Sequence, residues 1–492
     1  MAEDAEEKRL DFLKRVRVLG KNVAQTGRNL RTIIVEPKRL VWTAVDQDSF
    51  ECLISRLEHL NSFLIALLDS SQARRLQEVM TATYLEVLQI RNDMESLAGL
   101  AVAYETEAQE SQKEYLKQLV EVRIQHTRVT QLSSESSTSP GSKRFIGTLL
   151  ESDEVRFAKR DLEQGAIQAR AHATYQGRDV WVEWKHVPYS GGWAGSRKYT
   201  EHRNGLLAGL LRHEKPVGFR ALPCLGYIKS RDGDDGIRFG IVFEKPAGEG
   251  AGSEPSALRD LYEQRSKPSL SARIMMCAVL ARCVHSFHAV NWLHKGLQSN
   301  NIIFFASAVH GQDLSRPFVS GFETSRPDTA DEMTEKPTPD PFADIYRHPY
   351  AQSGQTDGKY RKSYDIYSLG IVLTEIAFWK RIENIVGIED LAKVKPPALG
   401  EVQSWLLGKP SSQSAALPPI SQGEGSCLQR LAPECGDAFR DVVERCLTAS
   451  NEEKPQYSGE SPSSVALRLQ HLMARDIVKR LEDVAVALQK NA

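Results

Sequence analysis

Residues 294–303 read His-Lys-Gly-Leu-Gln-Ser-Asn-Asn-Ile-Ile, a polar loop that leads into an apolar pair. Farther upstream, residues 180–185 alternate β-branched or aromatic side chains with polar ones, and residues 237–243 form a second strand-like run. The stretch before this loop has a helical pattern, in which the apolar side chains share one face: Ile274, Cys277, Ala281, Val284 and Phe287. A strand-rich stretch followed by a helix-rich stretch predicts an α+β, two-lobed domain. We expect its two lobes to span residues 145–255 and 256–490.

The loop resembles the catalytic loop of protein kinases, in which a histidine and an asparagine stand seven residues apart, as His294 and Asn301 do here. Four other kinase motifs have similar counterparts in the expected order. Val182-Glu183-Trp184-Lys185 resembles the strand that carries the nucleotide-binding lysine, and Ser320-Gly321-Phe322-Glu323 stands where the Asp-Phe-Gly triplet belongs. The remaining counterparts are residues 346–350, for the Ala-Pro-Glu region, and residues 365–376, for the long central helix.

Two glycines depart from the kinase pattern. In kinases the loop aspartate accepts the proton of the substrate hydroxyl, and the triplet aspartate binds Mg²⁺. Here those positions are Gly296 and Gly321, which supply neither a base nor a carboxylate ligand. Residues 151–176 also contain only one glycine, Gly165, so the glycine-rich cover over the phosphates is missing. The resemblance therefore implies a pseudokinase with no catalytic residue and no metal site.

A residual nucleotide site remains as a prediction. It consists of Lys185, Asn301 and Glu201, which lies in a predicted helix over residues 198–213. A Lys185–Glu201 pair would hold the lobes together without catalysis, and ATP would bind there without depending on magnesium. The alternative is that Lys185 is an edge-strand lysine on a solvated face. By the same resemblance, His294 and Asp365 have structural roles.

An atypical but active ATP-dependent Ser/Thr protein kinase is the alternative function. It would require displaced acidic groups, and Glu323, two residues after Gly321, is the candidate. General-base assistance typically contributes a factor of about 10²–10⁴. The loss of both aspartates therefore favours the non-catalytic interpretation.

The composition is that of an ordinary soluble protein, with 41% hydrophobic and 26% charged residues in 492. A formal net charge of −1 argues against a protein that coats nucleic acid. The seven cysteines are scattered and include no Cys-x-x-Cys pair, so we do not expect a thiolate zinc site. We expect free thiols in a reducing compartment instead. The charged start of the chain has no apolar segment behind it, and we expect a cytoplasmic protein.

The first part of the chain has a helical pattern. Leu53, Leu57, Leu60, Leu64 and Leu67 follow a 4-3-4-3 spacing, which places them on one face of a helix. Similar stripes follow, and they end before the serine-rich stretch at residues 133–142. We therefore predict an all-helical bundle over residues 1–128, a linker over 129–144, and the two lobes after it. By pattern alone, such a bundle is also consistent with a passive docking or oligomerisation module.

Segments of this bundle resemble the later helices of the fungal HeLo, or prion-inhibition-and-propagation, domain. The segments are residues 39–53, 60–64 and 88–97. The apolar N-terminal helix with which that family perforates membranes has no counterpart at residues 1–10, so the domain is either shortened or lacks that step. The layout of a HeLo-like bundle before a pseudokinase resembles the mixed-lineage kinase domain-like effectors of cell death.

Residues 8–39 hold ten Lys and Arg against Asp11 and Glu36, a local balance of +8. Apolar side chains interleave with these charges, so the stretch could bind an anionic membrane surface, or it could be a solvated helix face. Its single aromatic, Phe12, gives no support for nucleic-acid binding. The sequence thus predicts a signalling protein, in fungal incompatibility or cell death, with protein partners and self-association through the bundle.

Overall fold

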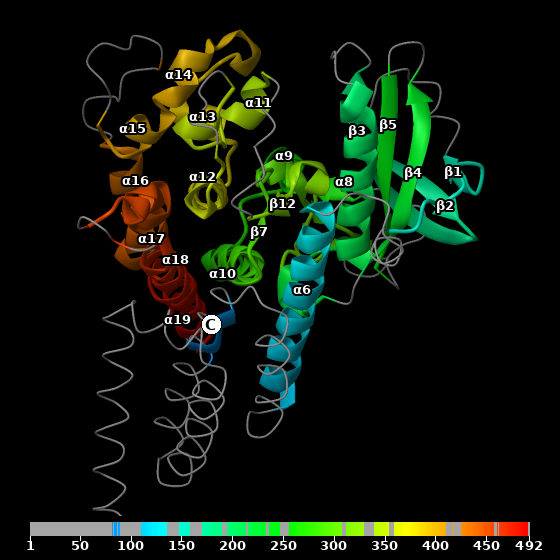
Figure 1. The fold of residues 1–492 in the computed structure, drawn as a ribbon. Helices are drawn as coiled ribbons and strands as arrows, with labels where there is room; N and C mark the ends of the chain where they lie inside the picture. The colour runs from blue at the N-terminus through cyan, green and yellow to red at the C-terminus, as the bar shows by residue number, and fades with distance from the viewer. Residues whose placement is uncertain are drawn as a thin grey trace, which may run out of the picture.

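The computed structural model places a sheet-rich part beside a larger helical part (Figure 1). The N-terminal basic stretch, residues 8–39, and most of the predicted bundle lie outside the residues that the structure describes. The described residues are 81, 83–85, 87–88, 110–134, 147–157, 170–188, 194–212, 215–232, 236–246, 255–307, 311–328, 339–353, 359–409, 417, 425–456, 460 and 462–490.

Five antiparallel strands form the sheet in the order β1-β2-β3-β5-β4. The alternation predicted from residues 180–185 is confirmed within β3, because Val180, Val182 and Trp184 face one hydrophobic cluster while Trp181 faces another. Strand β3 is therefore covered on both faces. The bounds are β1 Val155–Phe157, β2 Arg170–Tyr175, β3 Arg178–Pro188, β4 Cys224–Asp232 and β5 Gly236–Glu244.

Helix α8, Ala194–Arg212, packs against β4 and buries Leu206, Leu207 and Leu210. The helix predicted over residues 198–213 is thus confirmed with an earlier start. Because β4 is the last strand in the order, α8 lies beside that edge of the sheet and not beside β3.

The helical part is organised around α12, Lys362–Phe378, which is buried along almost its whole length. Helix α10, Leu270–Ala289, packs against it and begins at Ser269, whose hydroxyl accepts the Ala272 N–H as an N-cap. Other helices here are α9 Leu258–Gln264, α11 Pro341–Asp344, α13 Ile382–Val386, α14 Pro396–Gly400, α15 Val402–Leu406, α16 Cys427–Cys435, α17 Asp437–Leu447, α18 Pro462–His471 and α19 Arg480–Lys490. The α+β prediction, strands first and helices second, is confirmed.

Short strands connect these helices. Strand β7, Trp292–Leu293, pairs with β12, Arg326–Pro327. Strand β8, Ile302–Phe304, pairs on one side with β11, Phe318–Val319, and on the other with β6, Ser256–Ala257. One more short pair joins β9, Ala306–Ser307, to β10, Gly311–Gln312. These pairings bring the segments around residues 296 and 321 together.

Helix α6, Glu110–Ser134, crosses the predicted boundary between bundle and linker. All but its last six residues fall in the predicted bundle 1–128, and those six fall in the predicted linker 129–144. The helix packs on α8, and its side chains Leu116, Leu119 and Val120 belong to the same hydrophobic core as α10 and α12. Within the described residues, α6 is therefore part of the body that follows it.

Among the described helices, α10 alone is long and apolar enough to cross a membrane by length and composition. Two thirds of that segment is buried inside the protein, where it contacts α12 and α19. A soluble core helix meets the same criteria, and the packing of α10 is that of a core helix.

Candidate functional site

The loop at residues 294–301 is hydrogen-bonded to Asp365 in the first turn of α12. The Asp365 carboxylate accepts the backbone N–H of His294 at 2.8 Å and that of Lys295 at 2.9 Å, and it also accepts the Tyr360 hydroxyl at 2.8 Å. The His294 ring packs against Phe322, and burial lowers the pKa of His294 to about 4. These contacts give both residues a structural role in positioning the loop backbone.

Gly296 and Gly321, which stand at the two aspartate positions of the kinase pattern, lie next to each other. A Cβ atom added to Gly296 would lie 3.1 Å from the Gly321 carbonyl oxygen and 3.3 Å from Thr324 Oγ1. Gly321 has a φ of +84°, in the left-handed region that disfavours other residues. A Cβ atom added there would lie 2.1 Å from Asn301 Nδ2. The position is therefore closed to any side chain in this arrangement.

Asn301 uses both ends of its side-chain amide within the protein. Its Nδ2 donates to the Gly296 carbonyl oxygen at 2.5 Å, and its Oδ1 accepts a hydrogen bond from the Arg170 guanidinium. Only 4% of Asn301 is exposed. In this conformation the amide oxygen already accepts a hydrogen bond from a cation of the chain itself.

Arg170, at the start of β2, was not predicted as a site residue. Its guanidinium reaches from the sheet to the loop of the helical part, where it also donates to the Asn300 carbonyl oxygen. It is a cation at the place where the kinase pattern would put the phosphates and their metal. No spacing or motif around residue 170 distinguishes it from other strand arginines, so the sequence alone could not have identified it.

Glu183, in the middle of β3, was also missed. Its carboxylate accepts the backbone N–H of Gly321 at 2.9 Å and that of Phe322 at 3.4 Å, and only 2% of the residue is exposed. Burial raises the pKa of Glu183, an effect that the charge of Arg170 opposes. Its position within the quoted 182–185 motif was a usable signal, because side chains two residues apart on a strand share a face and Glu183 therefore lies on the face of Lys185.

The Glu201 carboxylate has a partner that was not predicted. It forms an ion pair with Lys229 of β4 at 2.7 Å, with both side chains about one-third exposed. Helix α8, which carries Glu201, packs against β4. Lys185 itself is half-buried on β3. Of the three predicted nucleotide-site residues, Asn301 forms a hydrogen bond with Gly296.

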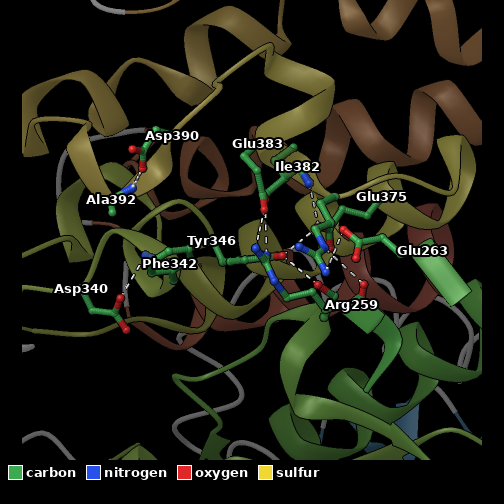
Figure 2. A network of polar contacts seen from close by, with 12 residues as sticks. Arg259, Glu263, Asp340, Phe342, Tyr346, Glu375, Ile382, Glu383, Asp390 and Ala392 are labelled. Atoms are coloured by element: carbon green, nitrogen blue, oxygen red, sulfur yellow. Dashed lines mark hydrogen bonds and ion pairs between the residues drawn. The ribbon is translucent and has the colours of Figure 1, made fainter. Parts of the chain in front are cut away.

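A second polar network fixes the far end of the loop (Figure 2). The Tyr346 hydroxyl lies 2.8 Å from the Ser299 hydroxyl and donates to the Glu375 carboxylate at 2.7 Å. Glu375 also accepts the Ile382 N–H at 2.8 Å, and burial raises its pKa to about 8. The loop is thereby tied to α12 and α13 through hydrogen bonds that involve no ligand.

Beside this network, the Arg259 guanidinium of α9 pairs with the Glu383 carboxylate of α13 (Figure 2). The two side chains are 15% and 10% exposed, so this is a largely buried ion pair. Arg381 makes a second pair in the neighbourhood, with Glu263 of α9 at 3.0 Å. Together these pairs join the start of the helical part to the turn after α12.

Helix α6 contacts the body close to the loop. The Tyr115 hydroxyl lies 2.8 Å from the Ser286 hydroxyl of α10, and Arg123 donates to the Val290 carbonyl oxygen at 3.2 Å. Burial lowers the pKa of Arg123 to about 10. The His126 ring is tilted against Trp292 of β7, directly before the loop. The helix therefore touches the segment from which residues 294–301 begin.

In the described part of the chain, no group of three or more His, Cys, Asp or Glu side chains is placed so that it could hold a metal ion. The six described cysteines are free and buried, and burial raises the pKa of those thiols, as at Cys224 to about 12. They are therefore poor metal ligands in the folded protein.

Two family models match the chain. Residues 2–100 match the HeLo family, described as prion-inhibition and propagation. This match supports the HeLo resemblance and ends before α6. Residues 249–487 match a domain of unknown function, DUF7580, which covers the helical part and carries no activity with it. None of the curated proteins matches the sequence.

Proposed function

We propose that this protein is a non-catalytic signalling protein in which a kinase-like body controls the HeLo domain at residues 2–100. The observation that carries this proposal is the position of α6. This helix follows the HeLo match and packs against both the sheet-rich part, through α8, and the helical part, through Ser286 and Val290. Any change in how the two parts of the body sit against each other would therefore act on the helix that follows the HeLo domain.

A second contact supports the same coupling. Three described side chains inside the HeLo match, Tyr84, Leu85 and Leu88, belong to the same hydrophobic core as α6 and α10. Leu88 is fully buried. Burying a leucine contributes roughly 1.5–3 kcal/mol, so these contacts are strong enough to hold part of the domain on the body.

The kinase-like interpretation of the body is supported by its order of elements. A five-stranded antiparallel sheet with a helix at one edge precedes the 294–301 loop and the buried helix α12. The non-catalytic interpretation is supported by Gly296 and Gly321, and by the Asn301 amide that fills the space beside Gly321. Together they argue for a kinase-like scaffold without phosphoryl transfer.

The catalytic part of the proposal is tested by phosphoryl transfer from γ-labelled ATP with the full chain, in Mg²⁺ and in Mn²⁺. We expect no turnover above that of a Lys185→Met variant. Robust turnover that disappears in Lys185→Met would overturn the non-catalytic proposal.

The control part is tested by loosening α6. A Tyr115→Ala/Arg123→Ala variant loses the contacts to Ser286 and Val290, while Glu121→Ala changes an exposed residue of the same helix and serves as the control. We expect the double variant to self-associate more strongly by light scattering because the HeLo domain is released. Equal masses for the double variant and Glu121→Ala, with a lowered melting temperature showing that α6 has been loosened, would contradict the proposal.

An active kinase is the second candidate. Glu323 lies close enough to Glu183 for its charge to raise the pKa of that carboxyl, so two acids gather near Gly321. If they held a metal, ATP would stabilise the protein in thermal unfolding only when Mg²⁺ or Mn²⁺ is present. A melting curve unchanged by ATP with either metal rejects this candidate.

The proposed role implies partners and a location. It includes self-association through the HeLo domain, binding to other proteins and a cytoplasmic location. The basic stretch at residues 8–39 is proposed to contact anionic membrane surfaces, and its +8 balance would make that binding sensitive to salt. Liposome co-sedimentation that does not depend on anionic lipid would contradict this membrane contact.

A further inference from the structure

The sheet and the loop of the helical part are joined by two polar contacts that cross between them. Arg170 of β2 donates to the Asn300 carbonyl oxygen and to Asn301 Oδ1, and the Glu183 carboxylate of β3 accepts the N–H groups of Gly321 and Phe322. Each contact spans more than 120 residues of sequence. Both converge on the segments that hold Gly296 and Gly321.

The two contacts support each other through Asn301. Arg170 holds the amide oxygen of Asn301, which turns Nδ2 toward the Gly296 carbonyl oxygen and into the space beside Gly321. Glu183 accepts the backbone N–H of Gly321 at 2.9 Å. Because the pairs place a cation and an anion of the chain at the junction, the chain supplies the charges that bound phosphates and metal would otherwise bring.

We propose that Arg170, Glu183 and Asn301 form an internal latch that holds the sheet against the helical part without nucleotide. This inference rests on the proposed function and deepens it, because it names the contacts that hold together the two parts of the body on which α6 packs. Opening the latch would then change how α6 packs on α8 and α10, and this change would not need nucleotide binding.

Charge-assisted hydrogen bonds of this kind contribute about 1.5–3 kcal/mol each, so losing one should increase local opening about tenfold or more. Backbone amides report that opening directly. The N–H groups of Gly321 and Phe322 bond to Glu183, and the preceding Ser320 N–H bonds to the Asn301 carbonyl oxygen at 2.8 Å. Hydrogen exchange at residues 320–322 therefore measures the closed state of the latch.

The experiment is hydrogen–deuterium exchange of the full chain, comparing wild type with Arg170→Ala and Glu183→Ala. Arg178→Ala is the matched control, since Arg178 makes an exposed ion pair with Glu244 at 3.3 Å on the same sheet. We expect about tenfold faster exchange at residues 320–322 in both latch variants and no more than about twofold change in the control. Glu183→Gln, which keeps an acceptor oxygen, should retain most of the protection.

Latch variants that exchange like Arg178→Ala would overturn the latch. So would wild-type protein whose residues 320–322 gain protection when millimolar ATP and Mg²⁺ are added. If the alanine variants do not fold, this second measurement on wild type decides alone. Phosphoryl transfer on the same samples separates the two proposals, because turnover overturns the non-catalytic function whereas control-like exchange without turnover overturns only the latch.

Discussion

The side-chain amide of Asn301 fills the space into which a side chain at position 321 would project, 2.1 Å from the Cβ that Gly321 lacks. In this arrangement an aspartate at position 321 would overlap the Asn301 amide, so that amide would have to move before a carboxylate could fit.

Restoring the kinase residue should destabilise the protein. Gly321→Asp combines a left-handed φ of +84° with the Asn301 contact, and we expect a loss of about 3 kcal/mol or more in unfolding free energy. Gly177→Asp is the matched control, because its φ of +76° is similar and nothing lies within 4 Å of its Cβ. Its cost should be about 1 kcal/mol. Equal losses in urea unfolding would show that Asn301 does not block the position.

Asp365→Asn should loosen the loop at residues 294–301. The carboxylate accepts two backbone N–H groups and the Tyr360 hydroxyl, and an amide would turn one N–H toward these donors. We expect about 3 kcal/mol of destabilisation and faster hydrogen exchange at residues 294–296. Asp390→Asn, at the exposed start of a short turn, is the control and should unfold like wild type. A wild-type exchange pattern in Asp365→Asn would refute the role of this carboxylate.

Arg259→Met should cost about 3 kcal/mol, because it leaves the Glu383 carboxylate largely buried without its cation. Replacing both residues by methionine should recover much of that loss, since no charge is then left in the interior. The measurement is a double-mutant cycle in urea. Losses that simply add would mean that the two side chains do not interact energetically.

Glu375 should make stability depend on pH on the alkaline side. Its pKa is raised to about 8 by burial, so its contribution to stability is full below its ordinary pKa of 4.5 and is lost as pH rises through 8. Lys362, whose pKa burial lowers from 10.5 to about 7, acts in the opposite direction from about pH 7 upward. The quantity to measure is therefore the difference in unfolding free energy between Glu375→Gln and wild type.

We expect that difference to shift in favour of Glu375→Gln between pH 6.5 and 9. Glu121→Gln, on the exposed face of α6, controls for the loss of a surface charge and should keep the wild-type profile. A Glu375→Gln profile parallel to that of wild type would show that Glu375 is not protonated in the folded protein.

Regular patterns predicted the fold better than the site. The strand at residues 180–185 and the helix at 365–376 carry strong periodicity or continuous apolar runs, and both were placed correctly. The ion pair of Glu201 with Lys229 was not predicted, because it depends on which strand α8 packs against, and the order β3-β5-β4 is set by long-range pairing. Arg170 and Glu183 were missed for a related reason. A strand pattern fixes the face of a side chain and leaves open which loop it meets.

The path of α6 has a consequence for how such a protein can be inherited. An exchange of N-terminal domains by recombination at the serine-rich stretch would remove Leu116, Leu119 and Arg123 from the core of the body. An exchange upstream of Glu110 would keep α6 in that core, and among the described residues it would change only Tyr84, Leu85 and Leu88. The serine-rich stretch is thus a poor place to cut, and α6 is expected to descend with the body rather than with the HeLo domain.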